Sequence, residues 1–422
     1  MSMSMRSASM LMLFVLPSAL CAYPHTYTNC GVTTTITAPP QRIITMNQGA
    51  TEFLLGLGLA DRMVGTAYLD DAIWPQYESD FNSIPVLSTT YPTEEQIMAL
   101  NPDFIMGAYN SAFREQYVTS SNQTRGIFSN DTVGPCDGAG SSWGEGVLDT
   151  CRPQLHAASI ATYLLADACE DTSLRPDTVS EEIVYQELRQ LGAIFDVAVE
   201  SVIDEMLEDF DAATVVLNTI VTDAPLKAMW FDCVGCCGSH EVFVGGGTGA
   251  PQMLMTESGL TNAFADLDGN WVCVNRSQIA IAAPDVIVLV DAAWDSVAEK
   301  IGWLYNQTEL CNLNVLQSAR FVNIPFSAST LGPRNGQAAL DMARAVANLH
   351  IGPSPRSQSG VNPVDTMTLA ADVAGLNCNF NDAMTSTFAT KTTTTTAPQV
   401  DAAVPSMLKL TSMLAVLIAN FL

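Results

Sequence analysis

The sequence predicts an α/β protein with two Rossmann-like lobes, joined by one long linker helix and separated by a ligand cleft. Three observations predict this fold. Short apolar runs alternate with helical patterns between about residues 23 and 350, one helical stretch is unusually long, and a segment before that stretch recurs after it. We therefore expect an N-terminal lobe at 23–176, the linker helix at 177–212 and a C-terminal lobe at 213–350.

Seven apolar runs have the length and bounding residues of buried strands. They occupy residues 42–46, 62–66, 104–107, 214–217, 242–244, 286–290 and 321–324. Because helical patterns separate most of these runs, we expect α/β units around mostly parallel sheets.

The linker helix is predicted from periodicity. Between Thr178 and Phe210, apolar residues recur at steps of three and four, which places them on one helix face. A helix of that length reaches about 50 Å, enough to run from one lobe to the other. Thr178 and Glu181 have the spacing of a capping box at its start. Gly192 leaves open the alternative of two helices broken near that residue.

A faint internal repeat supports two similar lobes. Residues 96–106 match residues 278–288, with Gln, Ile, Pro, Asp and Ile coinciding. In both copies we expect a helix to end, a Pro-Asp turn to follow and a buried strand to begin. The copies lie on opposite sides of the linker.

Both ends of the chain have processing signals. Residues 1–22 combine Arg6, a short apolar run and small residues, which is typical of a secretory signal peptide; a buried helix is the alternative. At the other end, a Thr-rich stalk at 351–405 precedes an apolar tail at 406–422. That pattern is typical of a GPI signal with attachment near 401–403, and a short membrane-spanning tail is the alternative. We expect the protein to follow the secretory pathway to the outer face of the plasma membrane.

Cysteines and sequons fit the same compartment. Of the 11 cysteines, Cys21 lies in the signal region, and the other ten suit disulfides whose pairing the sequence leaves open. Cys136 and Cys151 bracket a Gly-rich loop and are candidates to staple it. Four Asn-x-Ser/Thr triplets are candidate glycosylation sites: Asn122, Asn130, Asn275 and Asn306.

Charge and histidine content exclude several functions. The formal net charge of -27 disfavours binding to nucleic acid. The four histidines have no pair at ligand spacing, so we predict no intrinsic cofactor and no directly held metal ion. A metal cluster remains an alternative, built from the three cysteines at 233, 236 and 237 with His240.

Several segments resemble a known family. Residues 42–65, containing Asn47-Gln48-Gly49-Ala50-Thr51-Glu52, resemble the opening strand–helix–strand of bacterial substrate-binding proteins for iron–siderophores, haem and cobalamin. Residues 84–86 and 96–106 resemble the next unit, and 262–267, Trp271-Val272, 284–288 and 321–326 resemble the C-terminal lobe and last strand. The resemblance implies the helical-backbone (class III) type of periplasmic binding protein. Surface-anchored eukaryotic forms similar to diatom ferrichrome-binding proteins are the nearer parallel, and a bacterial branch for deazaflavin precursors is also similar.

In importers of this family, one surface Glu per lobe docks on a permease. Glu95 matches the N-terminal position, whereas Ser277 stands at the equivalent C-terminal position, inside the Asn275 sequon. A glycan there would block docking. We therefore expect ligand delivery through an endocytic partner or a reductase rather than an ATP-driven permease.

Ligand-binding residues are chosen just after the expected strands, where ligands bind in open α/β lobes. They are Asn47, Tyr68, Trp74, Tyr91, Tyr109 and Trp143 in the N-terminal lobe, and Trp230, Trp294, Phe326 and Arg334 in the C-terminal lobe. Aromatic rings suit a bulky chelate, and Arg suits its exposed oxygens.

The expected function is a non-enzymatic surface receptor that binds a ferric siderophore chelate, with the hydroxamate type favoured. Alternatives are a binder of cobalamin, haem or another cofactor-like molecule, and an adhesion protein with a vestigial cleft. Residues 140–144 fit the G-x-S-x-G pattern of serine hydrolases but have loop-like flanks. Residues 245–250 resemble a dinucleotide loop, although a strand-to-helix turn is the preferred interpretation.

Overall fold

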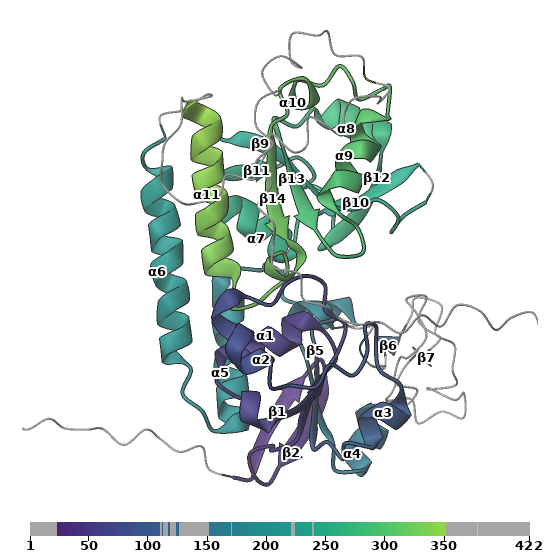
Figure 1. Ribbon diagram of the computed structural model, residues 1–422, viewed down its shortest axis with the longest axis vertical. Helices are drawn as coiled ribbons and strands as arrows, with labels where there is room; N and C mark the ends of the chain where they lie inside the picture. The colour runs from purple at the N-terminus through teal and green to yellow at the C-terminus, as the bar shows by residue number, and fades with distance from the viewer. Residues whose placement is uncertain are drawn as a thin grey trace, which may run out of the picture. The chain divides into compact units, whose positions relative to one another are not determined.

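Helices and strands alternate through two lobes in the computed structural model (Figure 1), which describes residues 23–109, 112, 117–118, 124–125, 152–169, 171–220, 224–238, 240–351 and 378. All these residues belong to one compact unit. Each lobe contains a sheet with helices packed against it, so the predicted two-lobed α/β class is confirmed.

The N-terminal lobe is built on a four-stranded parallel sheet in the order β4-β3-β5-β8. Its strands are β3 (Ile43–Thr45), β4 (Met63–Thr66), β5 (Phe104–Gly107) and β8 (Ala161–Leu164). Its α-helices are α1 (Gln48–Gly56), α2 (Glu78–Phe81), α3 (Glu94–Met98) and α4 (Arg152–Ala157). Two antiparallel pairs stand beside the sheet: β1 (His25–Asn29) with β2 (Val32–Ile36), and β6 (Tyr117–Val118) with β7 (Thr124–Arg125).

The C-terminal lobe has a mixed sheet in the order β12-β10-β9-β13-β14, with β11 also pairing with β9. Its strands are β9 (Leu226–Cys233), β10 (Glu241–Gly245), β11 (Leu260–Asn262), β12 (Trp271–Asn275), β13 (Val286–Asp291) and β14 (Phe321–Pro325). Its helices are α7 (Gly249–Glu257), α8 (Arg276–Ala282), α9 (Val297–Tyr305), α10 (Asn314–Gln317) and α11 (Asn335–Ile351).

Strand periodicity creates the layers of each lobe. Successive strand side chains point to opposite sheet faces, so an apolar run buried throughout feeds two cores. In β3, Ile43 joins a large core and Ile44 a separate cluster on the other face. In β9, Trp230 joins that same large core, whereas Met229 faces a cluster within the C-terminal lobe. One core is therefore continuous from lobe to lobe.

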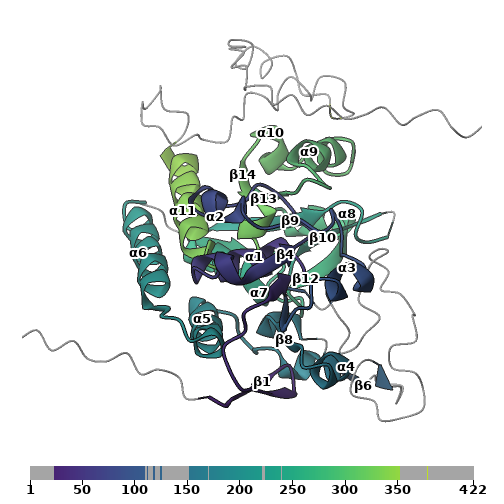
Figure 2. The ribbon, with the colours of Figure 1, turned by 60° about the horizontal axis from the view of Figure 1, so that its bottom comes forward.

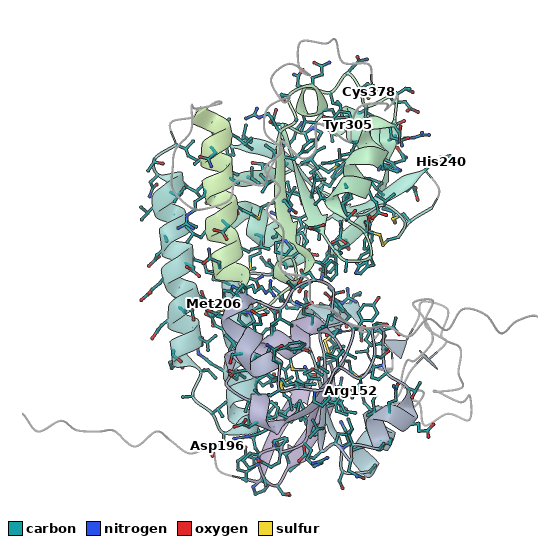
Figure 3. All side chains as sticks on the ribbon, in the orientation of Figure 1. Arg152, Asp196, Met206, His240, Tyr305 and Cys378 are labelled. Carbon is teal, nitrogen blue, oxygen red and sulfur yellow. A yellow bond between two sulfur atoms is a disulfide. The ribbon has the colours of Figure 1, made fainter. Side chains whose placement is uncertain are left out.

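The linker consists of two helices, α5 (Glu181–Phe195) and α6 (Glu200–Leu217), rather than one long helix. Asp196 ends α5 in the left-handed conformation, with φ of 54°, at the turn labelled in Figure 3. Val199 then packs on Gly192, where an added Cβ would lie 2.4 Å from Val199 Cγ1. Both helices bury their apolar faces in the same core, so the apolar period persists across the break. The N-cap is Ser180 without a side-chain bond, so the predicted Thr178 capping box does not form.

Helices α6 and α11 lie side by side (Figure 1; Figure 2). Their close approach depends on Gly336 at the start of α11, where an added Cβ would lie 2.8 Å from the carbonyl oxygen of Met206. Met206 is labelled on α6 in Figure 3. The absence of a side chain at Gly336 thus lets the two helix backbones touch.

The internal repeat is confirmed in structural detail. Helix α3 precedes β5 and α8 precedes β13, with the Pro-Asp turn between helix and strand in each case. Asp103 accepts hydrogen bonds from the backbone N–H groups of Gln41 and Arg42, both at 2.8 Å. Asp285 accepts one from Lys227 N at 3.0 Å. In both lobes this aspartate therefore fixes the start of the neighbouring strand.

The strand predictions succeed at six of the seven segments and fail at residues 214–217, which form the end of α6. The run that forms the central strand β9 was missed, as were β1, β2, β8, β11 and β12. Residues 214–217 are rich in β-branched side chains, but packing of the α6 face on the core overrides that local preference.

Four disulfides connect described cysteines: Cys30–Cys169, Cys233–Cys236, Cys237–Cys273 and Cys311–Cys378. The three cysteines of the alternative metal cluster are therefore all oxidised, which contradicts that alternative. The expected Cys136–Cys151 staple lies outside the described residues, as do the signal region, most of the stalk and the apolar tail. No helix in the described part of the chain combines the length and apolar character that crossing a bilayer requires.

Candidate ligand-binding site at the lobe junction

The loops that follow the strands of both lobes meet at one junction. From the N-terminal lobe come the loops after β4 and β5, and from the C-terminal lobe those after β13 and β14. Contacts between the lobes are direct: Trp294 Nε1 lies 3.4 Å from Asp70 Oδ1, and Ala293 N donates to the Asp70 carbonyl at 2.8 Å. The strand ends, which are the usual ligand edge of such sheets, thus face one another.

A second contact joins the neighbouring residues. Asp71 Oδ2 accepts hydrogen bonds from the backbone N–H and the hydroxyl of Ser327, both at 2.8 Å. Asp71 Oδ1 accepts another from Gln48 Nε2 at 2.7 Å. Since Gln48 begins α1 and Ser327 follows β14, Asp71 ties the first helix of one lobe to the last loop of the other.

A buried ion pair forms the third contact. Arg334 donates through Nε and Nη2 to the two carboxylate oxygens of Glu52, and through Nη2 to the carbonyl of Ala72 at 2.8 Å. Glu52 Oε1 also accepts from Trp74 N at 3.2 Å, and the Trp74 ring centre lies 6.0 Å from Arg334 Cζ. The Arg334 guanidinium is therefore paired with the Glu52 carboxylate, and Trp74 packs beside this pair.

Aromatic side chains from both lobes surround the junction. Tyr68 stacks on Tyr91 with ring centres 4.9 Å apart. Phe326 contacts Tyr109 at 6.3 Å across the junction and Trp294 at 5.4 Å. Trp294 is 45% exposed although it contacts the Phe326 ring. This cluster offers flat apolar surfaces to a bulky molecule.

Two carboxyl groups at the junction have strongly perturbed acidities. Burial raises the pKa of Asp70 to about 8, with the Trp294 hydrogen bond opposing and the charges of Asp71, Asp232 and Glu52 adding to the rise. Burial likewise raises the pKa of Asp232, at the end of β9, to about 7, although the Lys300 charge lowers it. Perturbed carboxyls at converging strand ends are typical of functional sites.

Several buried polar atoms near the junction have no hydrogen-bond partner among the described residues. They are Asp70 Oδ2, Asp232 Oδ2, Asn47 Nδ2, Thr330 Oγ1, Trp230 Nε1 and Trp271 Nε1. Buried polar groups in native proteins are normally paired, so these six atoms are exceptions among the described residues.

Five of the ten predicted ligand residues take part in two groups of ring contacts: Tyr68 with Tyr91, and Tyr109 and Trp294 with Phe326. Trp74 and Arg334 lie instead at the Glu52 pair. Trp143 lies outside the described residues.

The other two predicted residues are fully buried. Trp230 is inside β9 rather than after a strand. Asn47 is the N-cap of α1, and its Oδ1 accepts from Ala50 N and Ala108 N. It joins the ends of β3 and β5 and shapes the loop that presents Tyr109.

Asp70 and Asp232 were missed by sequence reasoning. The pair Asp70-Asp71 falls four residues after the apolar run of β4, which is a signal that strand-end reasoning could have used. Asp232 is the penultimate residue of an eight-residue strand that was not predicted, so its position could not be inferred.

The glycine-rich segment after β10 is a packed turn. The N–H groups of Gly246, Gly247 and Thr248 donate to carbonyls of Asn270, Leu267 and Gly269. An added Cβ at Gly247 would lie 2.1 Å from the Ala265 carbonyl oxygen. These N–H groups are unavailable to a phosphate, and β10 runs antiparallel to both neighbours, which contradicts a dinucleotide loop.

The surface positions of the repeat are equivalent in structure. Thr93 and Gln96 form a capping box at α3, and Asn275 and Gln278 form one at α8. Glu95 and Ser277 are both exposed at the second helical residue. Asn275 and Asn306 are exposed, whereas Asn122 and Asn130 lie outside the described residues.

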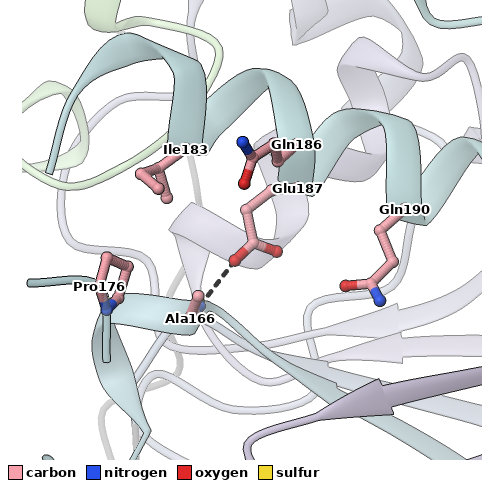
Figure 4. Close-up of a pocket in the computed structure, with 6 residues that line it drawn as sticks. All are labelled: Ala166, Pro176, Ile183, Gln186, Glu187 and Gln190. Atoms are coloured by element: carbon pink, nitrogen blue, oxygen red, sulfur yellow. Dashed lines mark hydrogen bonds between the residues drawn. The ribbon is translucent and has the colours of Figure 1, made fainter. Parts of the chain in front are cut away.

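A separate pocket of about 330 Å³ lies beside α5, lined by Ala166, Pro176, Ile183, Gln186, Glu187 and Gln190 (Figure 4). Glu187 Oε1 accepts from Ala166 N at 2.7 Å, and Tyr163 donates to its other oxygen. Burial raises the pKa of Glu187 to about 7. This pocket contains no aromatic side chain and its acid is already paired, so it suits a bulky chelate less well than the junction.

Comparisons with known proteins agree with this fold. The sequence model of a family described as periplasmic binding protein matches residues 43–301. A periplasmic binding protein from Veillonella parvula has a TM-score of 0.58 at 18% identity, covering 76% of this chain and 97% of its own. An ABC-type Fe3+-hydroxamate transport system structure from Saccharomonospora viridis has a TM-score of 0.58 at 19% identity, covering 77% and 99%.

The haem-binding protein HmuT has a TM-score of 0.53 at 17% identity, covering 79% of this chain and 93% of its own. At these identities the similarity concerns the fold. No curated protein matches the chain in sequence.

Proposed function

We propose, from the premise that this chain belongs to the periplasmic binding protein family, that it is a surface receptor which binds a ferric hydroxamate chelate at the lobe junction. The observation that carries the proposal is the cluster of Tyr109, Trp294 and Phe326, contributed by loops of both lobes at converging strand ends. A binding role requires no reacting group at this place. The receptor is therefore proposed not to be an enzyme.

The chemistry of the junction favours a chelate over a bare metal or haem. A preformed chelate supplies the ligands of its own iron, so the protein needs only surfaces and hydrogen bonds. The four histidines lie in or beside β1, α4, β10 and α11, away from the junction loops, so none is placed as an axial haem ligand.

We further propose that the receptor reaches the outer face of the plasma membrane and is held there by a GPI anchor, as a eukaryotic form of the family. Four disulfides support an oxidising secretory route. Phosphatidylinositol-specific phospholipase C should then release the protein from intact cells. Retention of the protein on treated cells would argue against the anchor.

We also propose that the ligand is delivered through an endocytic partner or a reductase rather than an ATP-driven permease. The reason lies at the two surface positions, Glu95 and Ser277, where importers of this family dock on a permease. Glu95 has no acidic counterpart, because Ser277 occupies the matching place at α8. Asn275 uses Oδ1 to cap the helix and is exposed, which leaves its amide nitrogen for a glycan. A stable permease complex that depends on Glu95 would contradict this proposal.

Titration calorimetry tests the ligand proposal. Ferrichrome should bind, whereas haem and cyanocobalamin should bind at least about tenfold more weakly, a difference of about 1.4 kcal/mol. Trp294→Ala should weaken ferrichrome binding by a similar factor through lost ring contact. The matched control is Ile281→Ala, which removes an 84% exposed apolar side chain on α8. Absence of binding and of thermal stabilisation by all three molecules would favour an adhesion protein with a vestigial cleft.

A further inference from the structure

We propose that the Cys233–Cys236 disulfide is a redox site which a dithiol reductant opens in the folded protein, and that its opening loosens the turn that carries Trp294. The effect on ligand affinity rests on the proposed receptor function, whereas the redox chemistry and the change at Trp294 do not. Three observations support the inference: the spacing of the two cysteines, the access to one of them, and a hydrogen bond from the disulfide loop to the Trp294 turn.

This disulfide closes the shortest loop of the four described. Cys233 and Cys236 are 3 positions apart in sequence, whereas the other described pairs are 36, 67 and 139 positions apart. The stabilisation that a disulfide gives to a fold grows with the length of chain that it closes. Opening Cys233–Cys236 therefore removes the least stabilisation, and the reduced protein stays folded. Proteins that exchange disulfides use the same Cys-x-x-Cys spacing.

The two cysteines differ in their access to a reductant. Cys233 is the last residue of β9 and is 3% exposed, whereas Cys236 is half-buried in the loop before β10, which also contains His240 (Figure 3). Gly235 and Gly238 near Cys236 are exposed and carry no side chain that would hinder an approaching molecule. Because thiol–disulfide exchange depends on access to the attacked sulfur, an incoming thiolate attacks Cys236.

The exchange moves two electrons and two protons from the dithiol to the protein. A thiolate of the reductant bonds to Cys236 Sγ, the Cys233–Cys236 bond breaks, and its electron pair leaves on Cys233 Sγ, which takes up a proton. The second thiol of the reductant, once deprotonated, attacks the reductant sulfur of this mixed disulfide. Cys236 then leaves as a thiolate and is protonated, and the reductant ends as a disulfide. Cys237 stays bonded to Cys273, so the opened loop remains attached to β12.

The disulfide loop is hydrogen-bonded to the residue that follows Trp294. Val234 lies between the two cysteines in sequence and donates its backbone N–H to Asp295 Oδ2 at 3.0 Å. Lys300, which is fully buried, places Nζ 3.0 Å from the same oxygen and also donates to the Asp295 carbonyl. The Asp295 carboxylate is thus held by two donors, and the position of one of them depends on the disulfide.

Asp295 in turn closes the turn that carries Trp294. Its backbone N–H donates to the Ala292 carbonyl at 3.2 Å, and its carbonyl accepts from Ala292 N at 3.3 Å. Trp294 lies between these paired residues, and its ring contacts Phe326 at the lobe junction. When reduction frees Val234, the turn loses one anchor, and a ligand must then order the Trp294 ring at a cost in entropy. The reduced receptor therefore binds its ligand more weakly.

Alkylation under native conditions tests the redox site in the full-length mature protein without ligand. The protein is incubated with dithiothreitol, free thiols are trapped with iodoacetamide, and the labelled peptides are quantified by mass spectrometry. Cys233 and Cys236 should be labelled at least about tenfold faster than the cysteines of any other described pair, while the circular dichroism spectrum stays native. Equal rates for all described pairs, or labelling only as the protein unfolds, would overturn the redox assignment.

Fluorine NMR of protein labelled with 5-fluorotryptophan tests the coupling to Trp294. The resonance that disappears in Trp294→Phe identifies this side chain. Reduction by dithiothreitol, or the double substitution Cys233→Ser with Cys236→Ser, should shift or broaden that resonance. The matched control, Cys311→Ser with Cys378→Ser, removes a disulfide that is anchored after the end of α9 and should leave the resonance in place. An identical Trp294 resonance in the oxidised and opened proteins would overturn the coupling.

Calorimetric titration with ferrichrome tests the consequence for binding. The reduced protein and the Cys233→Ser, Cys236→Ser variant should bind ferrichrome at least about threefold more weakly than the oxidised protein, and the control variant should keep the full affinity. Equal affinities of the oxidised and reduced proteins would overturn redox control of binding. If neither form binds ferrichrome, the receptor proposal fails for that ligand, and the labelling rates and the Trp294 resonance still decide the redox inference.

Discussion

The Glu52–Arg334 pair offers the sharpest test of how the lobes are held together. It joins α1 of the N-terminal lobe to the segment before α11, and the two residues are 2% and 7% exposed. Replacing Arg334 by Met would leave the Glu52 carboxylate buried without its cation. Breaking a buried pair in this way costs about 3–5 kcal/mol.

The expected loss of unfolding free energy can be narrowed from the hydrogen bonds that Glu52 keeps. After Arg334→Met, Glu52 keeps hydrogen bonds from Gln48 Nε2 and Trp74 N, so we expect the lower half of that range, about 3–4 kcal/mol. A loss of this size lowers the melting temperature by roughly 6–8 °C, at about 2 °C per kcal/mol for a large domain.

The assay is calorimetric or dichroism-monitored unfolding of the ligand-free protein. Arg344→Met breaks the exposed Asp341–Arg344 pair, whose side chains are 43–52% exposed, and should cost less than about 1 kcal/mol. Adding Glu52→Gln to Arg334→Met should recover part of the loss by removing the stranded charge. A loss no greater than that of the control would refute the reasoning.

Three further predictions concern stability. Gly336→Ala should force α6 and α11 apart at the Met206 carbonyl, costing about 1–3 kcal/mol in denaturant unfolding, and a neutral effect would contradict the proposed close approach. Burial raises the pKa of Asp70 from 3.8 to about 8, so its contribution to stability is complete below pH 4 and is lost as pH rises to 8. The melting temperature should therefore fall between pH 4 and pH 8. Asp70→Asn should make that fall smaller. Replacing Cys30 and Cys169 by Ser removes a disulfide between residues 139 positions apart in sequence and should lower the unfolding free energy by about 2–5 kcal/mol. Chemical unfolding measures this loss, and an unchanged midpoint would count against a structural role for the disulfide.

The fold was largely predictable because its signals are local and repeated. The Pro-Asp turns predict the starts of β5 and β13. In the structure, Asp103 and Asp285 each accept a backbone hydrogen bond that fixes the neighbouring strand. The linker was less predictable, since an apolar period of three and four is kept by two helices that share one core. Only the left-handed Asp196 and the return of Val199 onto Gly192 create the break, and those depend on tertiary packing.

The candidate site was predictable in part. Aromatic residues after recognised strands, such as Tyr109 and Phe326, lie at the junction as expected. Arg334 does not lie open to a ligand, because its partner Glu52 is 282 residues away in sequence and no local pattern marks the pair. Asp232 was not predicted because the strand was assigned to the β-branched residues 214–217 at the end of α6. The apolar run that forms β9 follows soon after them.

Iron anomalous scattering from crystals grown with ferrioxamine B tests the central claim most directly. We predict one iron site per chain beside Tyr109, Trp294 and Phe326. Iron located beside α5 instead, or no ordered iron at saturating chelate, would contradict the assignment of the lobe junction as the ligand-binding site.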